Sequence, residues 1–138
     1  MNILYLLRYM AKVIEGIVGL SNLYLKQLPN IFDDVTVNGG FYCGHNKLIT
    51  LKGSPKKVLG DFFCDHNRIT NLEGSPEYVG GNFICSSNPR LTSIEGLPKY
   101  IGGFMYCRYN RNLKYNSKEE LRKKIRSLCF VKGPIYLS

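Results

Sequence analysis

The segment that decides the fold is GGNFICSSNPRLTSIEGLP, residues 80–98, because close relatives of it stand on both sides in the chain. The cysteines reveal the period, since intervals of 21, 21 and 22 residues separate Cys43, Cys64, Cys85 and Cys107. An asparagine follows each of them three residues later, at Asn46, Asn67, Asn88 and Asn110. Such self-similarity is typical of a solenoid, in which each unit buries its apolar side against its neighbours.

Each unit combines a short strand with an irregular return. Phe62 and Cys64 alternate with polar or outward residues, which is the period of two expected of a strand with one buried face. The asparagine after the strand can satisfy backbone groups that the turn leaves unpaired. Gly74 and Pro76 then favour an extended return path rather than a helix. Units of this kind can be followed from residue 22 to residue 115.

The pattern Phe62-x-Cys64-x-x-Asn67-x-Ile69 resembles that of leucine-rich repeat proteins, most closely the short type with a proline-containing return. The resemblance implies an α+β repeat solenoid, a horseshoe with a parallel sheet of about 4–5 strands on its concave face. Two features depart from the family pattern. Cysteine takes the usual leucine position, and Gly80 and Gly102 stand where an opening apolar residue is expected. A parallel β-helix is the structural alternative.

The first segment, residues 1–20, is predicted to be an amphipathic helix that caps the first repeat. Its apolar stripe consists of Ile3, Leu7, Met10, Ile14 and Ile17. Charged residues inside the segment argue against a signal peptide and against a transmembrane helix. Attachment to a membrane surface is the alternative role. The chain is thus divided into residues 1–20 as the N-terminal cap, 21–115 as the repeats and 116–138 as a basic C-terminal capping helix and tail.

The C-terminal segment is predicted to begin a second capping helix at a capping box, Ser117 to Glu120, with Leu121, Ile125 and Leu128 facing the last repeat. The net charge of +9 is concentrated here: residues 1–98 carry nine Lys/Arg and eight Asp/Glu, and residues 99–138 carry ten Lys/Arg and two Glu. The predicted basic surface comprises Arg111, Lys114, Lys118, Arg122, Lys123, Lys124 and Arg126. It could be a solvated helix face, or it could bind an acidic protein or the phosphates of nucleic acid.

The five cysteines are predicted to be reduced and buried. Their number is odd and the spacing of four of them equals the repeat period, so a column of core thiols is the better interpretation, with disulfides or metal ligation as alternatives. Reduced thiols indicate an intracellular protein, which would be cytoplasmic, or in the host cytoplasm if the source is viral.

Alternate strand residues should point outward from the sheet and form columns along the solenoid. Three aromatic residues in one such column favour a partner-binding surface, although aromatic residues also pair across strands simply to stiffen a sheet. The predicted partner-binding residues are Tyr42, His45, Phe63, Asp65, His66, Tyr106, Arg108 and Tyr109.

His45 and His66 occupy one column of adjacent units, beside Asp65. Two imidazoles and a carboxylate can hold zinc or share a proton, but polar contacts with a partner are the favoured interpretation. Because the chain has no third histidine, we predict no metal site. Because it shows no activated nucleophile, Gly-rich phosphate loop or paired catalytic carboxylates, we predict no enzymatic activity or cofactor.

The sequence therefore predicts a non-enzymatic protein-binding module with a basic end that steers an acidic partner. Its repeats also resemble those of small bacterial and bacteriophage-encoded proteins, and that resemblance implies an inhibitor or modulator of a host protein. The alternative is a nucleic-acid-binding protein that uses the basic C-terminal surface, with Tyr106 and Tyr109 available for base stacking.

Overall fold

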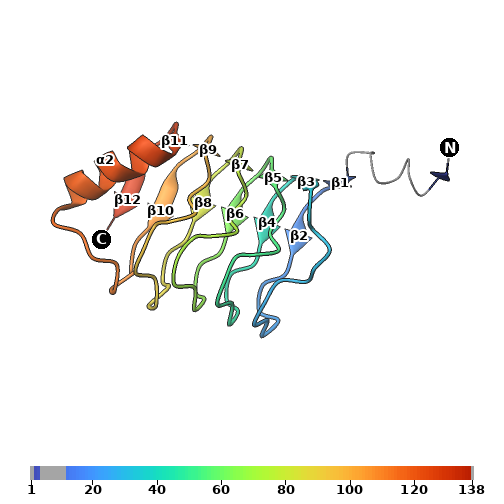
Figure 1. Ribbon diagram of the computed structural model, residues 1–138, viewed down its shortest axis with the longest axis horizontal. Helices are drawn as coiled ribbons and strands as arrows, with labels where there is room; N and C mark the ends of the chain where they lie inside the picture. Colours follow the sequence, from blue (N-terminus) through green and yellow to red (C-terminus); the bar gives the residue numbers. More distant parts are fainter. Residues whose placement is uncertain (1, 4–11, 138) are drawn as a thin grey trace.

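The chain winds into a solenoid whose successive turns lie side by side along one axis (Figure 1). This computed structural model describes residues 2–3 and 12–137, and in that part each turn contributes one short strand to each of two six-stranded parallel sheets. Sheet A contains β1 (Lys12–Glu15), β3 (Val35–Asn38), β5 (Lys57–Val58), β7 (Tyr78–Val79), β9 (Tyr100–Ile101) and β11 (Phe130–Val131). Sheet B contains β2 (Val18–Gly19), β4 (Phe41–Tyr42), β6 (Phe62–Phe63), β8 (Phe83–Ile84), β10 (Met105–Cys107) and β12 (Ile135–Leu137).

The predicted repeat solenoid is confirmed, but the leucine-rich-repeat horseshoe with a helix at each end is wrong. Each turn carries two strands instead of one, and the protein is mostly β. The extra strands β5, β7 and β9 end in Val58, Val79 and Ile101, which are fully buried. The two-sheet coil is closer to the parallel β-helix alternative than to a horseshoe.

The N-terminal segment was expected to be helical over residues 1–20, and this is wrong for the part that the structure describes beyond residue 3. Lys12–Glu15 and Val18–Gly19 are strands that pair with β3 and β4. Gly16 lies between them with a φ of 94°, a left-handed conformation that interrupts a helix. Ile14 and Val18 pack against the core, while Ile17 is exposed. Residues 1 and 4–11 of the predicted helix lie outside the described residues.

The core is built from columns of equivalent side chains. Phe41, Phe62 and Phe83 stack with centroid distances of 5.6 and 5.7 Å and interplanar angles of 7°. Parallel pairing in register places identical positions of successive turns directly beside one another. The same register aligns Cys43, Cys64, Cys85 and Cys107 in a second column. The period of 21–22 residues seen in the sequence therefore corresponds to one turn of the solenoid.

A column of glycines forms the corner at which the chain passes from sheet A to sheet B. The backbones come close there: Gly60 N–H donates to Gly39 O at 2.9 Å, and Gly81 N–H donates to Gly60 O at 2.9 Å. A Cβ atom on Gly81 would lie 2.9 Å from the carbonyl carbon of Gly60, so only glycine fits without a shift of the backbone. The register places six glycines in this column: Gly16, Gly39, Gly60, Gly81, Gly103 and Gly133.

A second column, of buried asparagines, forms the corner at which sheet B ends. The Asn88 side chain is fully buried, and its Nδ2 donates to the carbonyls of Cys64, Cys85 and Ser86 at 3.0–3.2 Å. Its Oδ1 accepts from the backbone N–H of Asn67 at 3.0 Å. Each asparagine thus bonds both its own turn and the preceding one, as the repeat pattern predicts.

The C-terminal segment combines a helix with a final pair of strands. Helix α2 (Lys118–Leu128) begins at Ser117, whose side chain accepts from Glu120 N–H at 3.1 Å, so the predicted N-cap is confirmed. Leu121 and Ile125 are buried as expected, but Leu128 is 55% exposed, because the chain leaves the helix there and enters β11. Strands β11 and β12 then extend sheets A and B by one strand each.

We expect Gly81→Ala to lower the free energy of unfolding by about 1–3 kcal/mol, because the added methyl group overpacks the corner. Gly19→Ala is the matched control, since a Cβ on Gly19 meets no atom within 4 Å. Urea unfolding of both variants measures the difference. Equal losses of stability would contradict the close-approach explanation.

We expect Asn88→Ala to cost about 3 kcal/mol or more, because four buried hydrogen bonds are lost and the Asn67 N–H is left without its acceptor. Asn71→Ala should cost no more than about 1 kcal/mol, since Asn71 Oδ1 accepts one exposed hydrogen bond, from Glu73 N–H. Equilibrium unfolding in urea is again the measurement. A similar loss in both variants would show that the buried asparagine does not hold the turns together.

Candidate functional site

The outward face of sheet B carries the predicted aromatic column. Strand register aligns Tyr42, Phe63, Ile84 and Tyr106 as expected. The column continues to Tyr136 of β12, a residue that the sequence analysis missed because α2 interrupts the period before it. The Tyr42 and Phe63 rings are 4.8 Å apart, and the Tyr106 and Tyr136 rings are 5.8 Å apart. We call these five side chains the aromatic column: Tyr42, Phe63, Ile84, Tyr106 and Tyr136.

Arg108 lies over one end of the aromatic column. Its guanidinium carbon is 5.4 Å from the Tyr106 centroid and 5.6 Å from the Tyr136 centroid, which is cation–π geometry. Its Nε atom is buried and has no hydrogen-bond partner among the described residues. A guanidinium held in place by two rings can donate hydrogen bonds from its other N–H groups to a carboxylate or phosphate. The adjacent Tyr109 is 62% exposed.

The two histidines and Asp65 come together at the other end of this face. His66 Nδ1 is 2.9 Å and His45 Nε2 is 3.4 Å from Asp65 Oδ2. The imidazole rings stack with their centroids 4.2 Å apart and their planes 12° apart. Gly44 lies beneath Asp65, since a Cβ on Gly44 would be 2.6 Å from Asp65 Oδ1. The absence of a side chain at this position leaves room for the carboxylate.

The column that contains the histidines has a backbone conformation that the sequence analysis did not anticipate. His45, His66, Ser87 and Tyr109 have φ values of 55°, 53°, 55° and 62°. Non-glycine residues rarely adopt this left-handed region, so each turn must hold it by tertiary bonds. One such bond runs from His45 N–H to Asp65 O at 2.9 Å, and another from His66 N–H to Ser86 O at 3.1 Å.

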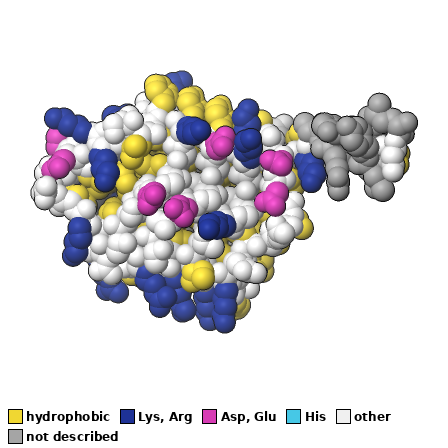
Figure 2. Space-filling view, in the orientation of Figure 1, with side chains coloured by type: hydrophobic (Ala, Val, Ile, Leu, Met, Phe, Trp, Pro, Cys, Tyr) yellow, Lys and Arg dark blue, Asp and Glu magenta, His cyan; other side chains and the backbone are white. Residues whose placement is uncertain are grey.

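Basic side chains also line the corner that follows the asparagine column. Lys47 is partly buried there, whereas Arg68, Arg90 and Arg111 are exposed. Figure 2 shows Lys and Arg side chains gathered along the lower edge of the molecule, where Figure 1 places the loop tips. We call this set the basic ridge: Lys47, Arg68, Arg90 and Arg111. From the sequence, the basic surface was expected at the C-terminal end, and only Arg111 belongs to both that surface and the basic ridge.

The predicted basic surface on α2 divides into two groups. Arg126 donates from Nη1 to Val131 O at 2.7 Å and from Nη2 to Gly133 O at 3.1 Å, and Arg122 donates from Nε to Ile135 O at 3.3 Å. These two arginines therefore hold the last strands against the helix. The remaining members are exposed: Arg111, Lys114, Lys118, Lys123 and Lys124.

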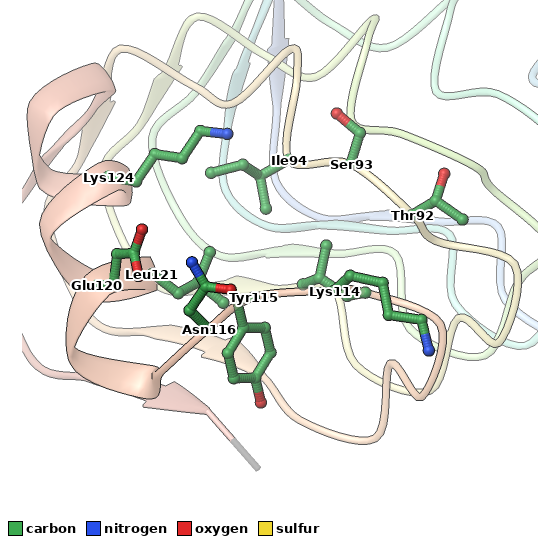
Figure 3. A pocket seen from close by; sticks show the side chains of 10 residues that line it. Thr92, Ser93, Ile94, Lys114, Tyr115, Asn116, Glu120, Leu121 and Lys124 are labelled. Atoms are coloured by element: carbon green, nitrogen blue, oxygen red, sulfur yellow. The ribbon is translucent and has the colours of Figure 1, made fainter.

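An open cleft of about 330 Å³ separates α2 from the loops of the last full turns. Figure 3 shows Lys124 reaching from the helix toward Ile94, while Lys114 and Tyr115 point away from the helix. The cleft is lined by polar, charged and apolar side chains: Thr92, Ser93, Ile94, Leu113, Lys114, Tyr115, Asn116, Glu120, Leu121 and Lys124.

Sheet A carries a second aromatic ladder that the sequence analysis missed. Tyr78 and Tyr100 stack at 4.7 Å with an interplanar angle of 3°, and Tyr100 and Phe130 stack at 5.4 Å with an angle of 11°. Lys57 Nζ lies 5.4 Å from the Tyr78 centroid. The sequence signal was the outward residue that precedes each buried Val or Ile. Aromatic pairing thus occurs on both sheets, so by itself it does not mark a binding face.

All five cysteines are free and buried, as predicted. Burial raises the pKa of the Cys43 and Cys64 thiols well above the ordinary range. Burial likewise raises the pKa of Cys129 to about 11. The hydrogen bond with Cys85 instead lowers the pKa of Cys107, but this thiol is only 3% exposed. Because a neutral or inaccessible thiol is a poor nucleophile, these side chains belong to the core and not to a reactive site.

We expect the folded protein to react very slowly with a thiol reagent near neutral pH, and to show five free thiols once denatured. Because burial raises the folded-state pKa values of Cys43, Cys64 and Cys129, these thiols ionise first in the unfolded chain as the pH rises. Stability should therefore be unaffected by these thiols below about pH 8 and should fall as the pH passes about 9. Timed labelling and urea unfolding across this pH range are the measurements. Rapid labelling of the native protein would contradict the buried-thiol column.

No described helix is both long and apolar enough to cross a bilayer.

The sheet-B face brings together aromatic, histidine and arginine side chains from four successive turns and from β12. Comparison of the chain with protein-family models, with curated proteins and with solved structures gave no match.

Proposed function

We propose that the protein is a non-enzymatic binding module and that the outward face of sheet B contacts an acidic surface of another protein. The observation that carries the proposal is the position of Arg108, whose guanidinium is held against the rings of Tyr106 and Tyr136. Tyrosine and arginine are the residue types that most often dominate binding energy at protein interfaces.

The arrangement of the face supports this role. The aromatic column supplies a flat, partly apolar centre, and the basic ridge follows the ends of the same strands. A patch with a desolvated aromatic centre and a charged rim is the usual anatomy of a protein interface. Positive rim charges mainly accelerate the encounter with an acidic partner.

The aromatic ladder of sheet A provides an internal comparison. Its rings stack nearly parallel, so they largely cover one another, whereas the Tyr42–Phe63 and Tyr106–Tyr136 pairs are tilted by 44° and 51°. Exposure alone does not separate the two faces, since Phe130 of sheet A is 61% exposed and Tyr136 of sheet B is 37% exposed. The faces differ in their charged partners: the Arg108 guanidinium lies over two rings of sheet B, whereas Lys57 lies over one ring of sheet A.

The resemblance of the repeats to small bacterial and bacteriophage-encoded proteins extends the proposal. On that basis the protein would act inside a cell, as an inhibitor or modulator of a host protein. The predicted residues His45, Asp65, His66 and Tyr109 would supply polar contacts around the aromatic column.

Nucleic acid is the second candidate partner, and the basic ridge favours it. One Lys or Arg from each successive turn gives a row of positive charges that a phosphate backbone could follow. Tyr109, which is 62% exposed, could stack on a base beside Tyr106.

Affinity capture compares the wild type with two triple variants. We expect Tyr42→Ala/Phe63→Ala/Tyr106→Ala to lose the captured partner, and the matched sheet-A variant Tyr78→Ala/Tyr100→Ala/Phe130→Ala to retain it. Circular dichroism and urea unfolding establish that both variants are folded. Equal capture by the two folded variants would exclude the sheet-B face.

Nuclease treatment and salt separate the two classes of partner. Capture of a protein should survive nuclease treatment. Labelled DNA and RNA are titrated in parallel at several salt concentrations, because phosphate contacts weaken steeply with salt. Tight, salt-sensitive binding of the oligonucleotides, together with loss of capture after nuclease treatment, would replace the protein partner with nucleic acid.

A further inference from the structure

His45, Asp65 and His66 form a compact group of three donor atoms on adjacent turns. The candidate ligand atoms all lie within 4.8 Å of one another. In a tetrahedral zinc site, with bonds of about 2.0–2.1 Å, two ligand atoms are separated by about 3.3 Å. The His45 Nε2 to Asp65 Oδ2 distance of 3.4 Å matches this separation, and the His66 Nδ1 to Asp65 Oδ2 distance of 2.9 Å is slightly shorter.

The backbone that carries these side chains is rigid. His45 N–H and His66 N–H are bonded to the next turn, and both residues share the left-handed conformation. Asp65 is held over Gly44, where no Cβ competes for its position. The backbone of such a site loses little conformational entropy on binding, because these hydrogen bonds already hold it in one conformation.

The side chains have room to complete the site. The imidazole planes are nearly parallel, so each ring must turn about its Cβ–Cγ bond before both lone pairs meet at one ion. The histidine side chains are 52% and 51% exposed, so about half of each ring is free of protein contact and the ring can turn. Asp65 is only 19% exposed and stays close to both rings.

We propose that His45, Asp65 and His66 bind a divalent transition metal ion of the zinc type. Two imidazoles and one carboxylate suit zinc, copper, nickel and cobalt, whereas magnesium and calcium prefer sites made of oxygen alone. Three protein ligands leave the remaining positions to water or to a group from a partner. The inference uses the geometry of this group alone and does not depend on the proposed function.

The test is direct measurement of metal binding by tag-free, fully reduced protein. Titration with Zn²⁺ against a chromophoric chelator should show one site per chain. His45→Asn, His66→Asn and Asp65→Asn should each weaken binding at least about tenfold. Asparagine is chosen for the histidines because it tolerates the left-handed backbone. Ser87→Asn, at the same position of the next turn, is the matched control and should bind like the wild type.

Gly44→Ala tests how the site is positioned while keeping every ligand. The added methyl group should displace Asp65 and weaken binding in a folded protein. Acidification should also weaken binding, because both imidazoles must be neutral to coordinate the ion.

A spectroscopic measurement distinguishes metal binding by the histidines and Asp65 from metal binding by the cysteine thiols. Bound Co²⁺ should give visible bands of nitrogen and oxygen coordination without a thiolate charge-transfer band. Wild-type zinc affinity equal to that of the His45→Asn/His66→Asn double variant, or a cobalt–thiolate band, would overturn the proposal. Neither result bears on partner capture through the aromatic column, so the two proposals fail separately.

Discussion

Successive turns of this protein can stack only if their backbones approach one another closely at both corners of the coil. At one corner stands a column of six glycines, and at five of them, Gly16 excepted, a side chain would collide with the backbone of the preceding turn. At the other corner buried asparagines bond the carbonyls that the bend leaves unpaired, as Asn67 does with Cys43 O at 3.0 Å and Cys64 O at 3.2 Å. The strands between the corners are mostly two or three residues long, so they depend on this close register for their stability.

The same constraint produces the surface chemistry. Because each turn pairs in register with the previous one, equivalent outward residues of successive turns form a column along the solenoid. A substitution in one turn therefore changes one position of that column. The two histidines stack because they occupy equivalent positions in adjacent turns. Asp65 lies close to both because Gly44 has no side chain to displace its carboxylate. Arg108 meets two tyrosines because β12 adds a final rung beside β10. The two proposed sites therefore lie at opposite ends of one face.

Several expectations failed where local pattern and tertiary pairing disagree. Ile14 and Ile17 fit a helical stripe, but pairing with the next turn draws the segment into strands and leaves Ile17 exposed. Leu128 continues the apolar stripe of α2, yet the chain turns into β11 there. Gly80 and Gly102 stood out as departures from the leucine-rich-repeat pattern. They adjoin the glycine corner, where the coil bends between two sheets that a horseshoe does not have.

By itself, the sequence determined the period, the solenoid, the inward columns, the buried thiols and the asparagine corner, because each depends on residues that recur at one spacing. Tertiary structure decided the second sheet, since strands of two residues are too short to show alternation. It also decided the contacts of Tyr136 and the roles of Arg122 and Arg126, because α2 interrupts the period before β12. The convergence of His45, Asp65 and His66 was visible as a column, but its distances follow from parallel register and from the space above Gly44.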